Sequence, residues 1–383
     1  MLGAQRIPIP SVQLTVDLGP RSYPIHIGPG LLAQAGTLIA PHLAGGRVLV
    51  VADATVAALH GATLMASLAA AGIDAAIESF PAGEPSKTLV TAERLWAACA
   101  RERIDRSGCV IGFGGGVSGD LAGFVAACWM RGVRFVQVPT TLLAMVDSAV
   151  GGKTGVDTDF GKNLVGAFCQ PACVIADPAV LGTMVPREYR AGLAEVLKYG
   201  VIKDPALLGW LESNAEALRE RDPAAIAHAV HESCRIKAWY VKEDEFERGP
   251  RAELNYGHTF GHALETEAGY AAYLHGEAVG IGMRMACALS ARLGTLRDAG
   301  LAARQDALLT RLGLPLAHNA RDSDEIGRLI ARTALDKKSS KGRVRFILPI
   351  EPGRMELRPV DDAAAVAEAF RTGCTAPSHA LSL

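Results

Sequence analysis

The chain has 383 residues, of which 49% are apolar and 21% are charged, a composition typical of a globular protein. At roughly 100–200 residues per domain, this length favours two domains. The net charge of −1 excludes a global attraction to nucleic acid or to an anionic membrane, so any anion binding must come from local charge clusters.

The first half of the chain alternates short β-branched runs with helical stretches rich in Ala and Leu. Strands are predicted over residues 12–16, 47–52, 74–80, 109–112, 134–138 and 173–176, and a helix over 88–101. Strands that alternate with helices need crossover connections, which predicts a largely parallel sheet. We therefore expect residues 1–185 to form an α/β domain.

From about residue 186 the pattern changes to long helical periodicity. Helices are predicted over 188–199, 206–219, 224–241, 259–267, 277–293 and 301–312, whereas only 344–348 is typical of a strand. Pro178 and Pro186 break the chain at the joint. We expect residues 186–383 to form a second, mainly helical domain.

Three features of the sequence bear on where in the cell the protein is located. No apolar run is long enough to predict a transmembrane helix. The N-terminus carries prolines and lacks the apolar core of a secretory signal. The eight cysteines form no CxxC pair, and we interpret them as reduced thiols of a cytoplasmic protein.

Residues 114–119, GGGVSG, follow a predicted strand and precede a predicted helix. This G-x-G-x-x-G spacing favours a pyrophosphate at the helix N-terminus, although a plain tight turn explains it about as well. The acidic residue that usually ends the next strand is absent, because that strand runs into Pro139. Asp53, at the end of an earlier strand, is the better candidate for the ribose hydroxyls.

A second glycine-rich stretch, GGKT at 151–154, resembles the end of a P-loop. A full P-loop requires a glycine where Asp147 stands, and the motif follows a helical stretch at 142–150, so a nucleoside triphosphatase is disfavoured. Lys153, Lys162 and Asn163 form either an anion pocket or a solvated loop.

The histidines indicate a metal site. His258 and His262 lie four residues apart and share one face of a predicted helix, and His275 follows. Two imidazoles plus one carboxylate, with one open position, are a usual catalytic zinc shell. The spacing does not decide which two histidines bind, or which carboxylate among Glu195, Glu265 and Glu277. HExxH is absent, which disfavours a zincin protease.

Seven motifs in order resemble those of the 3-dehydroquinate synthases. They are FGGGVSGDLAGF at 113–124, QVPTTLL at 137–143, VGGKTG at 150–155, GKNLVGAF at 161–168, GLAEVLKYG at 192–200, LNYGHTFGH at 254–262 and LHGEAV at 274–279. The likeness runs from about Asp53 to about Lys338. It implies a Rossmann-like, NAD-binding N-terminal domain and an all-α C-terminal domain that binds metal and substrate.

The resemblance also implies an activity. The chain would be a carbon–oxygen lyase that converts 3-deoxy-D-arabino-heptulosonate 7-phosphate to 3-dehydroquinate and phosphate, in the shikimate pathway of aromatic amino acid biosynthesis. The implied steps are transient oxidation, β-elimination of phosphate, re-reduction, ring opening and aldol closure. The implied cofactors are NAD and Zn²⁺ or Co²⁺. Arg131 would reach the site of a neighbouring subunit, which implies a homodimer.

The resemblance assigns site residues by matching motifs. The metal ligands would be Glu195, His258 and His275. NAD would contact Asp53, Gly83, Glu84, Lys87, Gly115, Gly116, Val117, Asp120, Thr140, Thr141, Lys153, Lys162 and Thr183. The substrate and catalytic set would be Arg131, Asp147, Lys153, Asn163, Lys198, Lys237, Glu247, Arg251, Asn255, His262 and Lys338.

The sequence leaves three alternative functions open. A related sugar phosphate cyclase that makes an inositol-like or valiolone-like product would tend to lack some of Arg251, Asn255, His262 and Lys338. A zinc polyol dehydrogenase would not need the cation cluster. A catalytically dead binding module would lack a polar group that the chemistry requires. The departures from the family pattern are small, with Ser118 and Tyr256 in place of more usual apolar residues.

Overall fold

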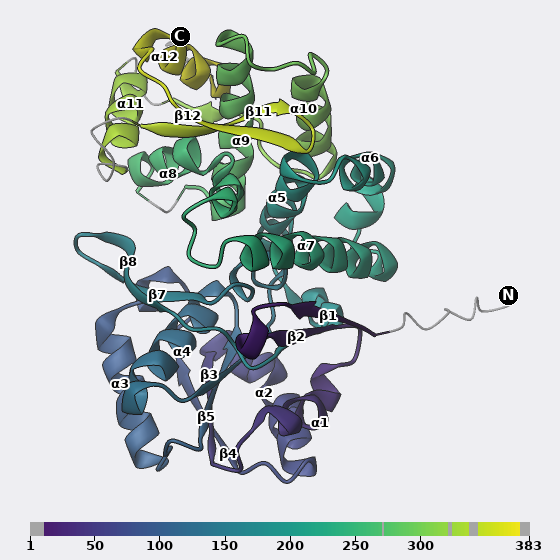
Figure 1. Cartoon of the computed structure of the whole chain (residues 1–383), viewed down its shortest axis with the longest axis vertical. Helices are drawn as coiled ribbons and strands as arrows, with labels where there is room; N and C mark the ends of the chain where they lie inside the picture. Colours follow the sequence, from purple (N-terminus) through teal and green to yellow (C-terminus); the bar gives the residue numbers. More distant parts are fainter. Residues whose placement is uncertain (1–10, 270–271, 321–323, 337–343, 376–383) are drawn as a thin grey trace, which may run out of the picture. The chain divides into compact units, whose positions relative to one another are not determined.

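The computed structural model describes residues 11–269, 272–320, 324–336 and 344–375 (Figure 1). The chain divides into two compact units. Unit 1 comprises residues 1–185 and 223–246, and unit 2 comprises 186–222 and 247–383. This division differs from the predicted boundary at 185/186, which places residues 223–246 in the second domain. Helix α7 (Pro223–Glu243) contacts β1 and β2 of unit 1, and helical periodicity does not reveal which body an apolar face packs against.

Unit 1 contains a seven-stranded sheet in the order β1-β2-β9-β6-β5-β3-β4. Only β1 and β2 pair antiparallel, so the expected parallel sheet is confirmed. The strand β2 was not predicted, because Pro24 interrupts its pattern. The strands are β1 (Val12–Val16), β2 (Tyr23–Ile27), β3 (Val48–Asp53), β4 (Ala75–Phe80), β5 (Cys109–Gly114), β6 (Arg134–Pro139) and β9 (Val174–Ala176).

Helices cover this sheet and form its core with it. They are α1 (Ala35–Ile39), α2 (Ala54–Ala70), α3 (Leu89–Arg101), α4 (Gly116–Cys128) and α7. The side chain of Asp53 accepts a hydrogen bond from the Val56 amide at 3.0 Å and so caps α2. Leu49, Val51, Leu95 and Leu121 are fully buried between β3, α3 and α4. Val48 and Val50, on the other face of β3, are also fully buried. The apolar run of β3 is therefore covered on both faces, as in parallel sheets generally.

A separate hairpin extends from unit 1, formed by β7 (Lys153–Thr158) and β8 (Gly161–Phe168). It was not predicted as strands, because its glycines read as a loop. The stretch predicted as a helix at 142–150 contains one turn of π-helix, Ala144–Ser148.

Unit 2 is mainly helical, as predicted. Its helices are α5 (Pro186–Ile202), α6 (Pro205–Arg219), α8 (His258–Glu267), α9 (His275–Arg292), α10 (Leu301–Arg311), α11 (Glu325–Asp336) and α12 (Ala363–Gly373). It is not strictly all-α. The predicted strand is β11 (Arg345–Glu351), which pairs with β12 (Arg354–Pro359), and β10 (His318–Asn319) pairs with β13 (Cys374–Thr375). A lone strand would leave its backbone groups unpaired, so a partner for β11 is required.

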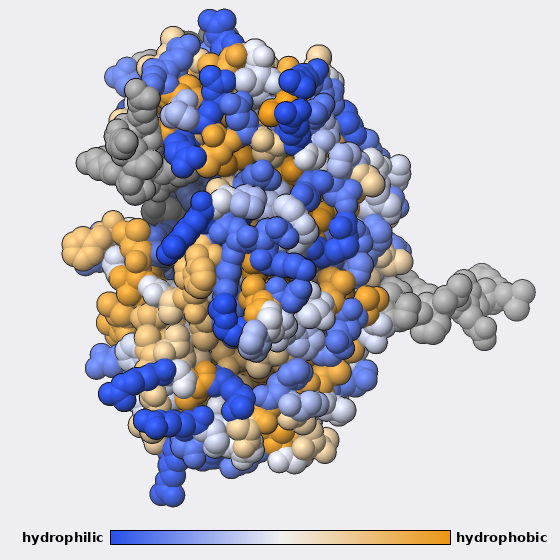
Figure 2. All heavy atoms as spheres, in the orientation of Figure 1, coloured by the Kyte–Doolittle hydropathy of each residue, from blue (hydrophilic) through white to orange (hydrophobic). Residues whose placement is uncertain are grey.

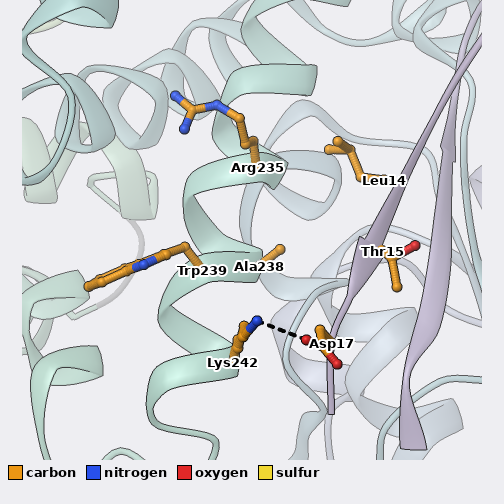
Figure 3. Close-up of a pocket in the computed structure, with 7 residues that line it drawn as sticks. All are labelled: Leu14, Thr15, Asp17, Arg235, Ala238, Trp239 and Lys242. Atoms are coloured by element: carbon orange, nitrogen blue, oxygen red, sulfur yellow. Dashed lines mark hydrogen bonds and ion pairs between the residues drawn. The ribbon is translucent and has the colours of Figure 1, made fainter. Parts of the chain in front are cut away.

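Within the described ranges, no helix combines the length and apolar character needed to cross a membrane. A small pocket of 210 Å³ opens on unit 1 between β1 and α7 (Figure 3). Leu14 and Thr15 line it from the strand and Asp17 from just after it, and an ion pair of 2.8 Å joins Asp17 to Lys242. None of its lining residues belongs to the predicted site.

Candidate functional site

The glycine-rich loop lies at the carboxyl edge of the parallel sheet. Strand β5 ends at Gly114 and α4 begins at Gly116, while the neighbouring strand β3 ends at Asp53. Ser118 lies 3.4 Å from an Asp53 oxygen, and the Thr140 amide donates to the Gly114 carbonyl at 2.9 Å. The fold thus gathers these predicted NAD contacts at one edge: Asp53, Gly115, Gly116, Val117, Thr140 and Thr141.

This edge fits a dinucleotide phosphate group. Gly114 adopts a φ of 151°, and a β-carbon there would lie 2.9 Å from Asp53 Oδ2, so only glycine keeps the loop open. The Thr140 hydroxyl is buried and has no hydrogen-bond partner in the described part of the chain. A buried hydroxyl without a partner costs free energy, and the N-terminus of α4 favours an anion beside it.

A second group of predicted residues centres on Lys87. Its ammonium lies 2.5 Å from Asp120 Oδ2 on α4 and donates to Asn163 Oδ1 on β8. Burial alone lowers the pKa of Lys87, but the negative charges of Asp120, Glu84 and Asp157 outweigh it, so the pKa is raised. The charged side chain of Lys87 therefore links α4, the helix after the glycine loop, to Asn163 on β8.

The hairpin carries the predicted anion-binding lysines. Lys162 pairs with Glu84 at 3.3 Å, and Lys153 is exposed at the start of β7. Asn163 has a φ of 56°, and its backbone N–H donates to Asp157 Oδ1 at 2.9 Å. Asp157 was missed by sequence reasoning, since nothing in its local pattern distinguishes it from a solvated loop carboxylate.

The buried ammonium of Lys237 forms an ion pair of 2.6 Å with the partly exposed carboxylate of Asp147 within unit 1. Asp147 lies on the π-helix turn and Lys237 on α7, whose Cys234 thiol also contacts the Met145 carbonyl at 3.2 Å. The pair explains how an ammonium can be buried, since a carboxylate compensates its charge. Lys237, predicted in the helical domain, belongs by its packing to unit 1.

Two predicted residues of unit 1 lie apart from these groups. Arg131 is exposed in the turn that follows α4, at the opposite end of this helix from the glycine loop. Thr183 lies in a turn after β9, and its hydroxyl contacts His60 on α2 at 2.9 Å. The sequence did not single out His60.

Unit 2 brings three metal-ligand atoms together. His258 Nε2 lies 3.6 Å and His275 Nε2 lies 3.8 Å from the same oxygen, Glu195 Oε1, and the three ligand atoms lie within 4.8 Å of one another. Glu195 is fully buried. Apart from an ion pair with Lys198, its carboxylate has no hydrogen-bond donor within the described ranges. A buried carboxylate facing two imidazoles fits a zinc-type cation.

Close helix contacts bring these ligands together. A β-carbon on Gly276 of α9 would lie 2.6 Å from the Ala191 carbonyl carbon of α5. One on Gly282 would lie 2.9 Å from the Gly261 amide of α8. The absence of side chains at these crossings lets α5, α8 and α9 approach closely enough for Glu195, His258 and His275 to converge.

The local hydrogen bonds of His258 select its ligand atom. Its Nδ1 lies 3.1 Å from the Tyr256 carbonyl, so Nδ1 carries the hydrogen and Nε2 presents its lone pair toward Glu195. Burial, then the positive charge of Lys198, holds the pKa of His258 well below its usual value. The Tyr256 hydroxyl bonds to Gln305 at 2.8 Å, which anchors this turn. Sequence reasoning noted Tyr256 only as a departure and missed this role.

The structure reduces the number of carboxylates that could be metal ligands from three to two. Glu277 does not face the cluster: Arg187 binds its two oxygens at 2.7 Å each, and it accepts from the Leu274 amide. Glu265 Oε1 lies 3.4 Å from His275 Nδ1, and His262, Glu265 and His275 form a second group of possible ligands. The two ring nitrogens of His275 thus face two different carboxylates.

Of the remaining predicted residues of unit 2, Lys198 lies on α5, Arg251 and Asn255 lie on the turn Pro250–Asn255, and Glu247 lies just before this turn. Lys198 pairs with Glu195, and Asn255 donates to Glu247 Oε1 at 2.5 Å. The Arg251 side chain is almost completely buried. Lys338 lies outside the described residues.

Comparison with known proteins points to one family. The sequence model of the 3-dehydroquinate synthase N-terminal family matches residues 77–191, and that of the C-terminal family matches residues 192–339. A curated 3-dehydroquinate synthase from Rhodospirillum rubrum is 53% identical to the chain over 94% of each sequence.

Two solved structures share the whole fold. The 2-epi-5-epi-valiolone synthase from Streptomyces hygroscopicus, with NAD⁺ and Zn²⁺ bound, is 29% identical with a TM-score of 0.81, covering 91% of this chain and 95% of that one. A 2-deoxy-scyllo-inosose synthase with carbaglucose-6-phosphate, NAD⁺ and Co²⁺ is 25% identical with a TM-score of 0.83, covering 94% of this chain and all of that one. Identity to the dehydroquinate synthase is thus much higher than to either of these cyclases, and the chain belongs to the 3-dehydroquinate synthase family.

Proposed function

We propose that this chain converts 3-deoxy-D-arabino-heptulosonate 7-phosphate to 3-dehydroquinate and phosphate, with Glu195, His258 and His275 as metal ligands. The observation that carries the ligand assignment is the buried Glu195 carboxylate, which faces two imidazole Nε2 atoms at 3.6 and 3.8 Å. The cofactor edge of unit 1 supplies the second requirement, a place for NAD.

The cofactors have distinct roles. A metal ion held by Glu195, His258 and His275 would polarise substrate hydroxyls, and NAD held along the Asp53–Gly115–Thr140 edge would accept a hydride and return it. The residues of the chain around the two cofactors would bind them or transfer protons. Asp53 and Thr140 hold the cofactor, and His262, whose ring centroid lies 5.5 Å from that of His258, moves a proton to or from the substrate.

The substrate carries two anionic groups, and each unit offers cations. In unit 1, Lys153 and Asn163 on the hairpin are proposed to bind the phosphate, and Lys237 is proposed to be held in place by Asp147. In unit 2, Arg251 is proposed to bind the carboxylate, since a guanidinium can donate two parallel hydrogen bonds to it. Asn255, on the same turn as Arg251, donates to Glu247.

Replacing Arg251 with alanine is expected to raise KM at least tenfold, because it leaves the substrate carboxylate without its partner. Steady-state kinetics with the heptulosonate phosphate measures this. Arg251→Lys is the companion variant, which retains charge and most of the volume but loses the paired geometry, and it should have an intermediate KM. An unchanged KM in Arg251→Ala would remove Arg251 from the substrate site.

The reaction itself is tested by substrate choice. The purified enzyme with NAD and zinc should form 3-dehydroquinate from the heptulosonate phosphate and should not cyclise sedoheptulose 7-phosphate or glucose 6-phosphate, which lack the carboxylate. Cyclisation of a neutral-headed sugar phosphate at a comparable rate would instead make the chain a cyclase of the valiolone or inosose type. Sustained oxidation of glycerol would make it a polyol dehydrogenase.

We also propose that the enzyme is a homodimer that forms through the β7–β8 hairpin. Phe160 is 92% exposed and Leu164 is 66% exposed, and Val165 and Phe168 are exposed beside them. Figure 2 shows apolar surface gathered over this hairpin. The outer edge of β8 pairs with no other strand in the described ranges, so it could accept a second copy. In such a dimer, Arg131 would serve the partner's site, as the family resemblance implies.

Leu164→Glu combined with Val165→Glu is expected to convert the dimer to a monomer, because two charges would replace apolar surface at the interface. Sedimentation velocity measures the mass. Leu59→Glu, at an exposed apolar position on α2, is the control and should leave the mass unchanged. A monomeric unmodified chain, or a double variant that stays dimeric, would contradict the hairpin interface.

We place the enzyme in the cytoplasm. All eight cysteines are free thiols, and five of them are buried. Unpaired thiols in this number suit a reducing compartment. The substrate is a small phosphorylated sugar acid, and nothing in the net charge calls for a nucleic acid or membrane partner.

A further inference from the structure

The segment that leads into His275 has little regular structure to hold it. His275 is the first residue of α9, and residues 272–274 before it belong to neither a helix nor a strand. The first amides of a helix have no intrahelical partner, so the position of such a residue depends on what fixes the preceding chain. His275 also has a more exposed side chain than His258, at 31% against 11%.

Each of the three residues before His275 nevertheless forms a hydrogen bond with another part of unit 2. Arg187 donates to the Ala272 carbonyl at 2.7 Å. The Leu274 amide donates to Glu277 at 3.0 Å, and Arg187 holds that glutamate in turn. Between them, the Tyr273 hydroxyl lies 2.9 Å from His318 Nδ1.

His318, the hydrogen-bond partner of Tyr273, is itself paired with a buried carboxylate. His318 Nε2 lies 3.1 Å from Glu325 Oε1, and the side chains of His318 and Glu325 are 5% and 0% exposed. Since the carboxylate accepts from Nε2–H, Nδ1 is left as the acceptor for the tyrosine hydroxyl. The hydrogen bonds thus run in one direction, from Tyr273 to His318 to Glu325.

The three residues come from separate parts of unit 2. His318 lies on β10, which pairs with β13, and Glu325 is the first residue of α11. A buried carboxylate and imidazole cost free energy that apolar residues of the same size would not. Packing alone does not require them here. Their arrangement instead fixes one ring tautomer and aims its acceptor nitrogen at the chain two residues before His275.

We propose that Tyr273, His318 and Glu325 are positioning residues that hold the metal-binding imidazole of His275 in place. The proposal rests on the proposed ligand set. It adds a second support to His275, whose Nδ1 already faces Glu265 at 3.4 Å. Outer groups that orient a metal-bound histidine typically change metal affinity by about 10- to 100-fold when they are removed.

The test is zinc affinity of the metal-free enzyme, measured by competition with a chromophoric chelator. Tyr273→Phe removes the hydroxyl and keeps the ring, and it is expected to weaken zinc binding by about tenfold or more. Tyr189→Phe is the matched control. Its hydroxyl donates to the Leu218 carbonyl at 2.8 Å in the same unit, so it loses a similar bond without affecting zinc affinity. Thermal unfolding of both metal-free variants measures the purely structural cost.

A double-mutant comparison separates this proposal from the ligand assignment. His275→Ala should weaken zinc binding strongly, and adding Tyr273→Phe to it should have no further effect, because the ligand that the tyrosine positions is gone. If His275→Ala leaves zinc affinity unchanged, the ligand set itself is wrong. If His275→Ala weakens binding but Tyr273→Phe matches Tyr189→Phe, the positioning role is overturned. Equal losses from Tyr273→Phe in both backgrounds would also overturn it.

Discussion

Replacing Glu195 with glutamine is expected to abolish tight zinc binding and to lower kcat/KM by about 1,000-fold or more. The amide keeps the shape of the side chain but removes the charge that balances the cation. A catalytic metal contributes several kcal/mol, and each 1.4 kcal/mol is a factor of ten in rate. Metal content after dialysis and steady-state kinetics measure the two effects.

The matched control is Glu265→Gln, which removes the other carboxylate that His275 faces. Glu265 is expected to orient the ring, so this variant should lose only about 10- to 100-fold in zinc affinity. If Glu265→Gln loses zinc and Glu195→Gln retains it, the ion is bound by His262, Glu265 and His275, the second group that the structure brings together.

Replacing Gly276 with alanine should lower both the stability of the protein and its affinity for zinc, although glycine has no functional group that could bind the metal. Its β-carbon would lie 2.6 Å from the Ala191 carbonyl carbon, and backbone cannot move aside as a flexible side chain can. Helix α9 must then shift against α5, which separates His275 from Glu195. We expect a loss of about 3 kcal/mol in the free energy of unfolding, together with weakened zinc binding.

Gly209→Ala on α6 provides the control for this variant. Nothing lies within 4 Å of a β-carbon at that position, so the extra methyl group should be neutral or should stabilise the helix by up to about 1 kcal/mol. Urea denaturation of the metal-free proteins measures both. A Gly276→Ala protein with the stability and zinc affinity of the unmodified chain would show that the close crossing does not determine the ligand geometry.

The fold was largely predictable because its pattern is local. Buried parallel strands such as β3 read as continuous apolar runs, and the helices of unit 2 show clear periodicity. The sequence did not predict which segments pack against or pair with each other. The pattern of α7 predicts a helix but not that it packs on unit 1. The β7–β8 hairpin was hidden by its glycines, of which Gly155 and Gly166 let the two strands approach closely.

The site was predictable in composition and less so in geometry. The spacing of His258, His262 and His275 indicated a metal site, but it could not choose between the carboxylates. That choice depends on helix crossings, which bring Glu195 to the histidines and give Glu277 to Arg187. Residues that support the site, such as Tyr256, His318 and Asp157, have no sequence motif, because their role depends on contacts between distant segments.

The most direct test of the function is phosphate release from 3-deoxy-D-arabino-heptulosonate 7-phosphate, with absorbance at the NADH band followed in the same cuvette. The proposed function predicts stoichiometric phosphate without net NADH, loss of activity on chelation, and recovery with zinc or cobalt. Absence of phosphate release, with NADH accumulating from a neutral polyol, would contradict it and would mean that this fold carries out a different reaction.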